Sequence, residues 1–229
     1  MNTVIVTGAN GNLGSAVTSK FLQKGYRVVA TVSNEGAIDS IIKHPNMDVY
    51  AVDLTNEEGA SAFANNVINK YQSVEAALLL VGGFAVGGIE STTGSDLKKQ
   101  YALNFEATYF VARPLFNLMM QQNKGRLVFV GARPTLKPED GKSLLAYSLS
   151  KSLIFKLAEL LNESAKGKNV SATVVVPSLI DTPFNRKNYP NANFDDWVKP
   201  EEIADLMEMI CNGAGEALRE TILKVYRNA

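Results

Sequence analysis

Tyr147 and Lys151, four residues apart, form the pair in this sequence best suited to acid–base chemistry. Residues i and i+4 lie on one face of a helix, so the phenol and the ammonium group can point into the same cleft. A lysine cation beside a phenol favours the phenolate and lowers the pKa of the tyrosine from its usual value of about 10. The spacing therefore predicts that Tyr147 donates and accepts a proton near neutral pH.

A turn rich in glycine and asparagine near the N-terminus is a candidate phosphate-binding site. It follows a short run of β-branched residues, 3–6, and precedes helical periodicity over 15–24. Such an order brings backbone N–H groups and a helix N-terminus onto a pyrophosphate, and glycine is needed where a side chain would block it. The alternative is a glycine turn without a ligand. The residues expected to hold a dinucleotide here are Gly8, Asn10, Gly11, Asn12, Leu13 and Gly14.

The Tyr147–Lys151 pair and the glycine turn must be positioned by the rest of the chain, in which short apolar runs alternate with helical segments. Strands are expected at residues 4–6, 27–32, 48–52, 76–81, 126–130, 171–176 and 221–225. Helices are expected at residues 14–24, 57–70, 94–122, 144–166 and 200–212. Continuous apolar strands separated by helices indicate a parallel sheet covered on both faces, with right-handed crossovers. We therefore predict an α/β fold: a Rossmann-like, doubly wound sheet of about seven mainly parallel strands, in a single domain over residues 1–229.

Composition excludes several functional classes. The chain has 229 residues, 46% of them hydrophobic, and its 23 basic and 23 acidic residues give zero net charge, which argues against a nucleic-acid partner. Cys211 is the single cysteine and His44 the single histidine, so we expect no disulfide and no metal site, and a cytoplasmic location. His44 is expected to face solvent in a loop. We expect neither a leader before the first strand nor a membrane span.

Four further positions follow predicted strands or lie within a helix. Asp53 could accept a hydrogen bond from an adenine amino group, or cap the helix that begins near Asn56. Gly82 and Gly83 would let the backbone pass close to a cofactor. Asn104 lies inside a long predicted helix, where it could hold an irregularity or a water molecule, or be a buried polar group.

Taken together, these features resemble the short-chain dehydrogenase/reductase family along essentially the whole chain. The resemblance implies NAD or NADP as cofactor, Tyr147 as the acid/base, Lys151 on the nicotinamide ribose, and a relay water at Asn104. It also implies a small-molecule substrate and a homodimer or homotetramer formed through helices 94–122 and 144–166. Cofactor contacts are expected from the glycine turn and from Ser33, Asp53, Leu54, Val81, Gly82, Gly83, Tyr147, Lys151, Pro177 and Thr182.

Within that family the sequence most resembles dihydropteridine reductases. The matching segments are 81–88, 130–133, 146–151, 181–187 and the loop 189–197. Most relatives have a serine where Ala132 stands; dihydropteridine reductases also lack it, and Thr135 or Ser143 could substitute. Phe84 replaces a tryptophan of that group and can still stack on a planar ring. Substrate contacts are expected from Phe84, Ala132, Arg133 and Phe184.

The sequence leaves two questions open: which nucleotide binds and which reaction follows. Ser33 stands where a carboxylate would bind the ribose diol of NAD, so a 2′-phosphate is not repelled, yet no basic residue is adjacent to bind it. The sequence thus favours NADPH slightly over NADH. The leading hypothesis is hydride transfer to a small, flat, conjugated acceptor. Alternatives are a carbonyl or 3-oxoacyl reductase, and a sensor that binds the dinucleotide without turnover. Arg186 or Lys187 could touch substrate or cofactor phosphate, or remain solvated.

Overall fold

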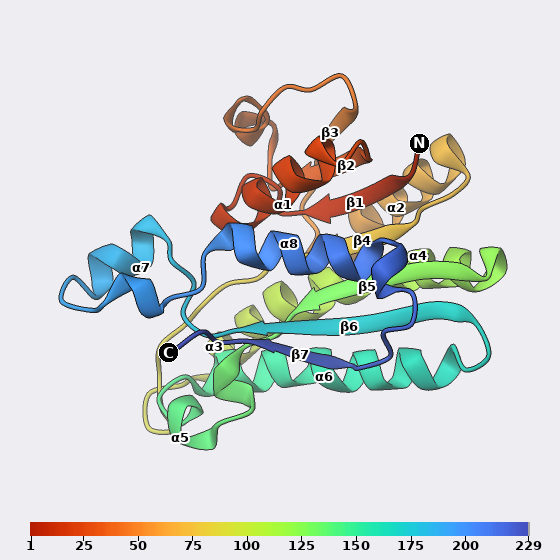
Figure 1. The fold of residues 1–229 in the computed structure, drawn as a ribbon. Helices are drawn as coiled ribbons and strands as arrows, with labels where there is room; N and C mark the ends of the chain where they lie inside the picture. Colours follow the sequence, from red (N-terminus) through yellow and green to blue (C-terminus); the bar gives the residue numbers. More distant parts are fainter. Residues whose placement is uncertain (229) are drawn as a thin grey trace.

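The computed structural model describes residues 1–228, and one parallel sheet organises them (Figure 1). Its seven strands follow the order β3-β2-β1-β4-β5-β6-β7, with every neighbouring pair parallel. The order reverses between β1 and β4, which is where a doubly wound sheet opens a crevice at the carboxyl ends of its strands. The strands are β1 Thr3–Thr7, β2 Arg27–Val32, β3 Met47–Ala51, β4 Ala76–Leu79, β5 Lys124–Val130, β6 Asn169–Pro177 and β7 Ile222–Val225. The predicted fold class is confirmed.

Helices cover both faces of the sheet, because the strands carry apolar side chains on both of their faces. One face packs under α1 and α8, through side chains such as Phe21 and Met207. The other packs under α2, α4 and α6, through Phe63, Leu115 and Ile154. The helices are α1 Asn12–Gln23, α2 Glu57–Tyr71, α3 Gly94–Tyr101, α4 Ala107–Gln122, α5 Pro138–Gly141, α6 Leu145–Ser164, α7 Pro183–Asn188 and α8 Pro200–Cys211.

The predicted helix 94–122 is interrupted at its centre. A π-helical turn, Ala102–Glu106, separates α3 from α4 and contains Asn104. Such turns occur mostly as single insertions in α-helices, frequently at functional sites. Of the three alternatives for Asn104, the helix irregularity is confirmed.

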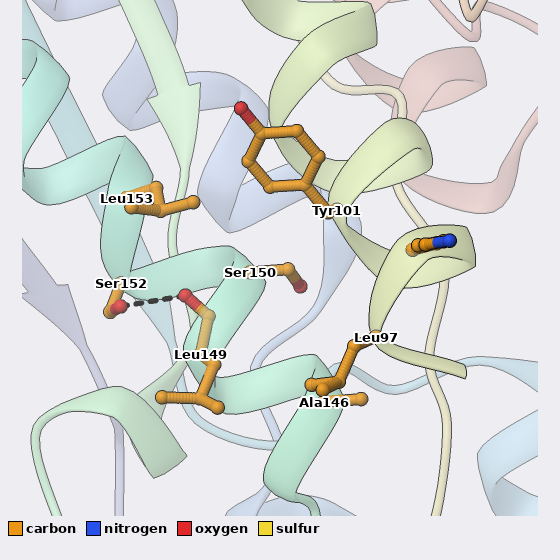
Figure 2. A pocket seen from close by; sticks show the side chains of 8 residues that line it. Leu97, Tyr101, Ala146, Leu149, Ser150, Ser152 and Leu153 are labelled. Atoms are coloured by element: carbon orange, nitrogen blue, oxygen red, sulfur yellow. Dashed lines mark hydrogen bonds between the residues drawn. The ribbon is translucent and has the colours of Figure 1, made fainter. Parts of the chain in front are cut away.

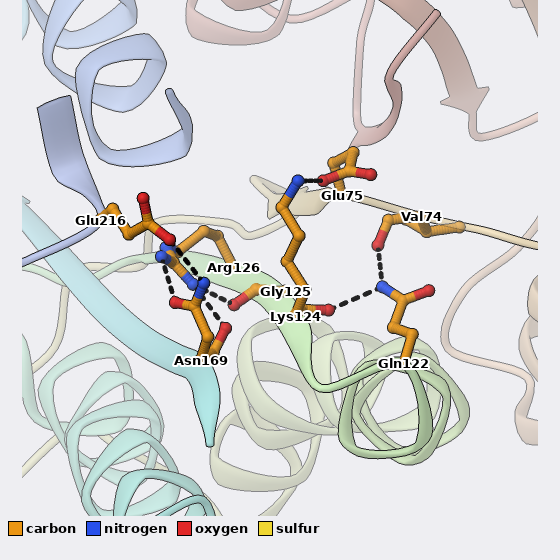
Figure 3. Close-up of polar contacts among 8 residues, drawn as sticks. All are labelled: Val74, Glu75, Gln122, Lys124, Gly125, Arg126, Asn169 and Glu216. Carbon is orange, nitrogen blue, oxygen red and sulfur yellow. Dashed lines mark hydrogen bonds and ion pairs between the residues drawn. The ribbon is translucent and has the colours of Figure 1, made fainter. Parts of the chain in front are cut away.

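A buried arginine joins strands at the amino end of the sheet, far from the crevice (Figure 3). The Arg126 guanidinium donates to the carbonyl oxygens of Gly125 (2.9 Å) and Asn169 (2.8 Å) and to Asn169 Oδ1 (2.8 Å). Asn169 Nδ2 in turn donates to Glu216 Oε1 (2.9 Å). These contacts link the starts of β5 and β6 to the segment that precedes β7.

Two remaining expectations concern the surface. His44 is half-buried rather than fully solvent-facing, because its Nδ1 accepts a hydrogen bond from the Asn46 N–H (3.1 Å) and so closes the turn.

Over residues 1–228, no helix has the length and apolar character to cross a bilayer. The same residues contain no cluster of three or more His, Cys, Asp or Glu side chains suited to a metal ion.

Candidate functional site

The predicted acid–base pair lies on the first turns of α6, at the carboxyl end of β5. Lys151 is buried, and its Nζ donates to the carbonyl oxygen of Val130, the last residue of β5 (2.9 Å). Tyr147 is half-buried, and the ring of Phe84 packs edge-on against it with 5.2 Å between centroids. Tyr147 and Lys151 thus lie one turn apart on α6, as the sequence predicts, and Phe84 packs against Tyr147.

The electrostatics of the pair differ from the expectation. Burial raises the pKa of Tyr147 to about 12 and lowers the pKa of Lys151 to about 8. Both shifts have one cause, since burial disfavours whichever form is charged. The expected lowering of the Tyr147 pKa is wrong, because the effect of burial outweighs that of the Lys151 ammonium, which donates to the Val130 carbonyl. At neutral pH the tyrosine is a phenol and the lysine a cation.

Asn104 is fully buried, and its side chain is occupied by protein partners. Its Oδ1 accepts from the Gly83 N–H (2.8 Å), and its Nδ2 lies 3.1 Å from the Gly83 carbonyl oxygen. Nδ2 also donates to Gln100 Oε1 (2.9 Å) and Ser150 Oγ (3.0 Å). These partners use both Nδ2 protons and one of the two lone pairs of Oδ1, so a relay water could bind only at Oδ1 or at a backbone carbonyl of the π-helical turn.

Gln100 and Ser150 are site residues that the sequence reasoning missed. A signal for Gln100 was available, since it lies four residues before Asn104 and so on the same helix face. Ser150 gave no comparable signal, although it directly precedes Lys151.

The glycines after β4 lie close to side chains of the site. A Cβ on Gly82 would lie 2.7 Å from Asn104 Oδ1 and 2.9 Å from Lys151 Nζ. A Cβ on Gly83 would overlap Leu103 Cδ2. A side chain at either position would therefore displace its neighbours in the site.

The glycine turn is fixed between two strands by threonines. Thr7 Oγ1 accepts from the Leu80 N–H (2.9 Å), whereas the Thr31 carbonyl accepts from the Ala9 N–H (2.9 Å). Gly8 has φ +64°, and a Cβ on Gly14 would overlap the Gly8 carbonyl, so both positions require glycine. The cap residue of α1, Gly11, provides no side-chain acceptor for the first N–H groups of the helix. The turn therefore presents backbone N–H groups of the kind that bind a pyrophosphate.

Next to this turn, the ends of β2 and β3 carry neutral and acidic groups. Ser33 is exposed, and its Oγ accepts from Asn34 Nδ2 (3.1 Å). Asp53 Oδ1 accepts from both Thr55 N (3.0 Å) and Thr55 Oγ1 (2.6 Å), and these hydrogen bonds lower the pKa of the carboxyl. The helix-cap alternative for Asp53 is wrong: Asn56 caps α2 by accepting from the Gly59 N–H. Leu54 is buried beside it, and Pro177 ends β6, also buried.

The segment after β5 carries Ala132 and the two residues, Thr135 and Ser143, whose hydroxyls could replace the missing serine. Ala132 is buried, and Thr135 Oγ1 donates to its carbonyl oxygen (2.5 Å). Arg133, an expected substrate contact, instead pairs with Asp140 (3.1 Å) and lies over the Tyr226 ring. Ser143 is exposed, and its carbonyl accepts from the Gly87 N–H.

The segment after β6 forms a short helical flap. Thr182 caps α7 by accepting from the Asn185 N–H (3.2 Å), and Phe184 on that helix is exposed. Arg186 forms two hydrogen bonds with Asp181 and lies over the Phe194 ring, and its side chain is 51% exposed, so it is a solvated charge paired with its neighbour. Lys187 is exposed, and it forms no hydrogen bond or ion pair with the described residues.

A groove of about 380 Å³ lies on the outer side of this site, between α3 and α6 (Figure 2). It does not contain Tyr147 or Lys151, although Ala146 and Ser150 border it. Its lining is mostly apolar: Leu97, Lys98, Tyr101, Ala146, Leu149, Ser150, Ser152 and Leu153.

Residues 2–193 match the model of the short chain dehydrogenase family. A dihydropteridine reductase of Dictyostelium discoideum is 25% identical over 226 residues, covering 96% of this chain and 93% of that protein. An acetoacetyl-CoA reductase of an Acinetobacter species is 26% identical over 192 residues, covering 79% of this chain and 75% of that protein.

Among solved structures, the protein ElxO with NADP bound superposes with a TM-score of 0.88. It is 18% identical in sequence, and the match covers 98% of this chain and 96% of that one. At this identity, the likeness extends to the fold.

Proposed function

The chain belongs to the short-chain dehydrogenase family, a family of NAD(P)-dependent oxidoreductases, and we propose that it reduces a small, planar, conjugated substrate of the quinonoid dihydropterin class. This proposal rests on one observation: the site has an exposed aromatic ring, and it lacks the hydroxyl that would bind a simple carbonyl oxygen. Phe84 presents a half-exposed ring against Tyr147, and Ala132 provides no donor for a simple carbonyl oxygen. A flat conjugated ring stacks on an aromatic side chain and needs little other anchoring.

The cofactor would be held at the carboxyl ends of β1 to β4. The turn Gly8–Gly14 would bind the pyrophosphate through backbone N–H groups, with Asp53 and Leu54 at the adenine and Lys151 at the nicotinamide ribose. Val81, Gly82, Gly83, Pro177 and Thr182 would line the nicotinamide half. When bound, the reduced nicotinamide supplies the hydride. The neutral group formed by Ser33 and Asn34 accepts a 2′-phosphate without repulsion, which favours NADPH slightly over NADH.

Tyr147 would give the substrate its proton. Because burial holds the phenol pKa at about 12, the side chain carries its proton at neutral pH, as a donor must. The phenolate left after transfer is stabilised by a neighbouring cation, and Lys151 is charged below pH of about 8. Substrate thus accepts one hydride and one proton, and the phenol is reprotonated from solvent.

Steady-state oxidation of NADPH and NADH, measured in parallel with quinonoid dihydropterin generated in the assay, tests this function. Rapid turnover supports it, and the preferred nucleotide defines the function of Ser33. Binding of both nucleotides without their oxidation would overturn the pterin assignment, and no turnover on any substrate would favour a sensor.

The similarity to an acetoacetyl-CoA reductase supports a second candidate, a 3-oxoacyl or general carbonyl reductase. Ala132 argues against it, since a ketone oxygen would lose a hydrogen-bond donor. The Ala132→Ser variant separates the two. It should raise kcat/KM for acetoacetyl-CoA while leaving pterin turnover within about twofold. A wild-type enzyme that already prefers acetoacetyl-CoA would make this second candidate the function.

The groove between α3 and α6 fits a homo-oligomer interface. Exposed apolar side chains surround it on both helices: Leu97, Tyr101, Leu149, Leu153 and Leu160. A second copy covering this face would remove them from water. Light scattering should give at least a dimer for the wild type and a monomer for Leu153→Lys. A monomeric wild type would exclude this interface.

A further inference from the structure

We propose that Gln100 and Ser150 are positioning residues that orient the Asn104 amide, and through it fix the Gly83 peptide and the Phe84 ring against Tyr147. This inference rests on the proposed function for its kinetic effect, whereas its structural effect does not depend on any substrate. All the polar atoms involved belong to buried side chains: Asn104 is 0% exposed, Ser150 3% and Gln100 4%.

The Asn104 amide pairs with both groups of the Gly83 residue. It accepts the Gly83 N–H at Oδ1 (2.8 Å) and approaches the Gly83 carbonyl with Nδ2 (3.1 Å). Among the described residues, no other hydrogen bond holds residues 82–86. On one side Thr7 accepts from the Val81 N–H (3.3 Å), and on the other Gly87 pairs with the segment before α6. The position of this loop therefore depends on the Asn104 amide.

An amide can lie in two orientations that exchange its oxygen and nitrogen, and its surroundings decide between them. Ser150 provides a directional constraint. Its Oγ donates its only proton to the Tyr147 carbonyl (2.9 Å), so toward Asn104 it can act only as an acceptor. Gln100 Oε1 is a second acceptor on the same side. Both therefore require Nδ2 toward themselves, which leaves Oδ1 to receive the Gly83 N–H.

The consequence extends to the proposed substrate ring through the chain itself. Phe84 directly follows Gly83, and its ring is 56% exposed, with the Tyr147 ring as its aromatic neighbour at 5.2 Å. If the amide turned over, its NH2 group would face the Gly83 N–H, and two donors would repel. The loop would then lose both of its hydrogen bonds to Asn104, and Phe84 its fixed position beside the phenol. Loss of either acceptor should therefore weaken substrate binding more than the chemical step.

Exchange of the Gly83 amide proton, followed by NMR on the full-length protein, tests the structural part. Ser150→Ala should exchange at Gly83 about tenfold faster, and Gln100→Leu should act in the same direction. Ser152→Ala is the matched control, because Ser152 Oγ bonds only to the Leu149 carbonyl on the same helix. Unchanged Gly83 exchange in both variants would overturn the inference. Gln100→Leu also keeps the test available should Ser150→Ala not fold.

Kinetics provide a readout that a merely structural effect would not reproduce. Ser150→Ala should raise KM for the pterin about three- to tenfold with kcat changed less than twofold, and Ser150→Thr should restore KM. In an Asn104→Ala background, Ser150→Ala should have no further effect, because both act through one amide. Additive effects would overturn the inference. If the wild type turns over no pterin, the proposed function fails, while the exchange experiment still decides the arrangement of Gly83.

Discussion

Two buried cations lie at opposite ends of β5 and differ in how many acceptors the protein provides for their N–H protons. Arg126, near the start of the strand, donates to three oxygens of Gly125 and Asn169. Lys151, at the other end, donates to the Val130 carbonyl alone, although an ammonium has three protons. Burial lowers the pKa of both side chains, but only the lysine reaches a value, about 8, at which it titrates in ordinary buffers.

The difference separates a cation that holds the fold from one kept for a ligand. A buried charge is tolerated when hydrogen bonds replace its lost water, and Arg126 has those hydrogen bonds. Lys151 has protons without acceptors among the described residues, and its Nζ lies close to Gly82. Such an incompletely satisfied charge is costly to stability unless a bound molecule completes its coordination, as the proposed ribose would. The amino end of the sheet is therefore built for stability, and the carboxyl end for binding.

Removal of the phenol should have the largest effect of any change at the carboxyl end. Tyr147→Phe should lower kcat by about 10²–10⁴-fold, the usual contribution of a positioned acid. Among residues 1–228 the hydroxyl has no protein partner, so the thermal midpoint should remain nearly the same. Steady-state kinetics and calorimetry on one preparation measure both. Retention of more than a tenth of wild-type kcat would show that the proton comes from elsewhere.

Replacement of the cation at the amino end should reverse that pattern. Arg126→Met leaves three buried oxygens without donors, partly offset by the relief of a buried charge. We expect a loss of about 2 kcal/mol in the free energy of unfolding. Turnover per folded molecule should remain unchanged, because Arg126 lies far from the crevice. Urea denaturation gives the first quantity and active-site titration the second. A fall in kcat without a change in stability would contradict the division between the two ends.

The fold was predictable because its signal is local and repeated. Each strand is an apolar run, as in Val4-Ile5-Val6, and each helix repeats its apolar residues on one face, so all seven strands were predicted within a few residues. The π-helical turn was not predictable in detail. The side-chain hydrogen bonds that Asn104 makes within it involve Gly83 and Ser150, which lie 21 and 46 residues away in the sequence.

The local placement of the candidate residues was predictable, but their energetics were less so. The spacing of Tyr147 and Lys151 placed both on one face of α6, and the fold brought Phe84 to Tyr147. Their pKa directions were not predictable, because burial depends on everything packed around them. Arg133 and Asp53 illustrate the same limit: each was expected at a ligand, and each is already paired by a neighbour, Asp140 or Thr55.

Lys151→Met should make the protein more stable and nearly inactive. The lysine pKa falls from 10.5 to about 8 on folding, which corresponds to about 3 kcal/mol. The lost hydrogen bond to Val130 subtracts about 1 kcal/mol, leaving a net gain of about 2 kcal/mol at pH 7. The unfolded chain binds the proton more tightly, so wild-type stability rises between pH 8 and 10.5 and the advantage of the variant disappears. Thermal melts from pH 7 to 10.5 measure this. A destabilised variant at pH 7 would show that Lys151 resembles Arg126 after all.

The smallest expected effect is the loss of wild-type activity above pH 8. Below that pH Lys151 is charged and stabilises the phenolate left by Tyr147; above it, the cation is lost and kcat/KM should fall by up to tenfold per pH unit. The groups nearest Nζ, the Val130 carbonyl and Gly82, do not titrate, and Tyr147, one helical turn before Lys151, has a pKa of about 12, above this range. Lys151→Arg is the control, because a guanidinium keeps its charge throughout this range. Its activity should be lower than wild type at pH 7 and flat to pH 9. A wild-type profile equally flat would mean that the charge of Lys151 does not act in the reaction, and the contrast with Arg126 would then concern stability alone.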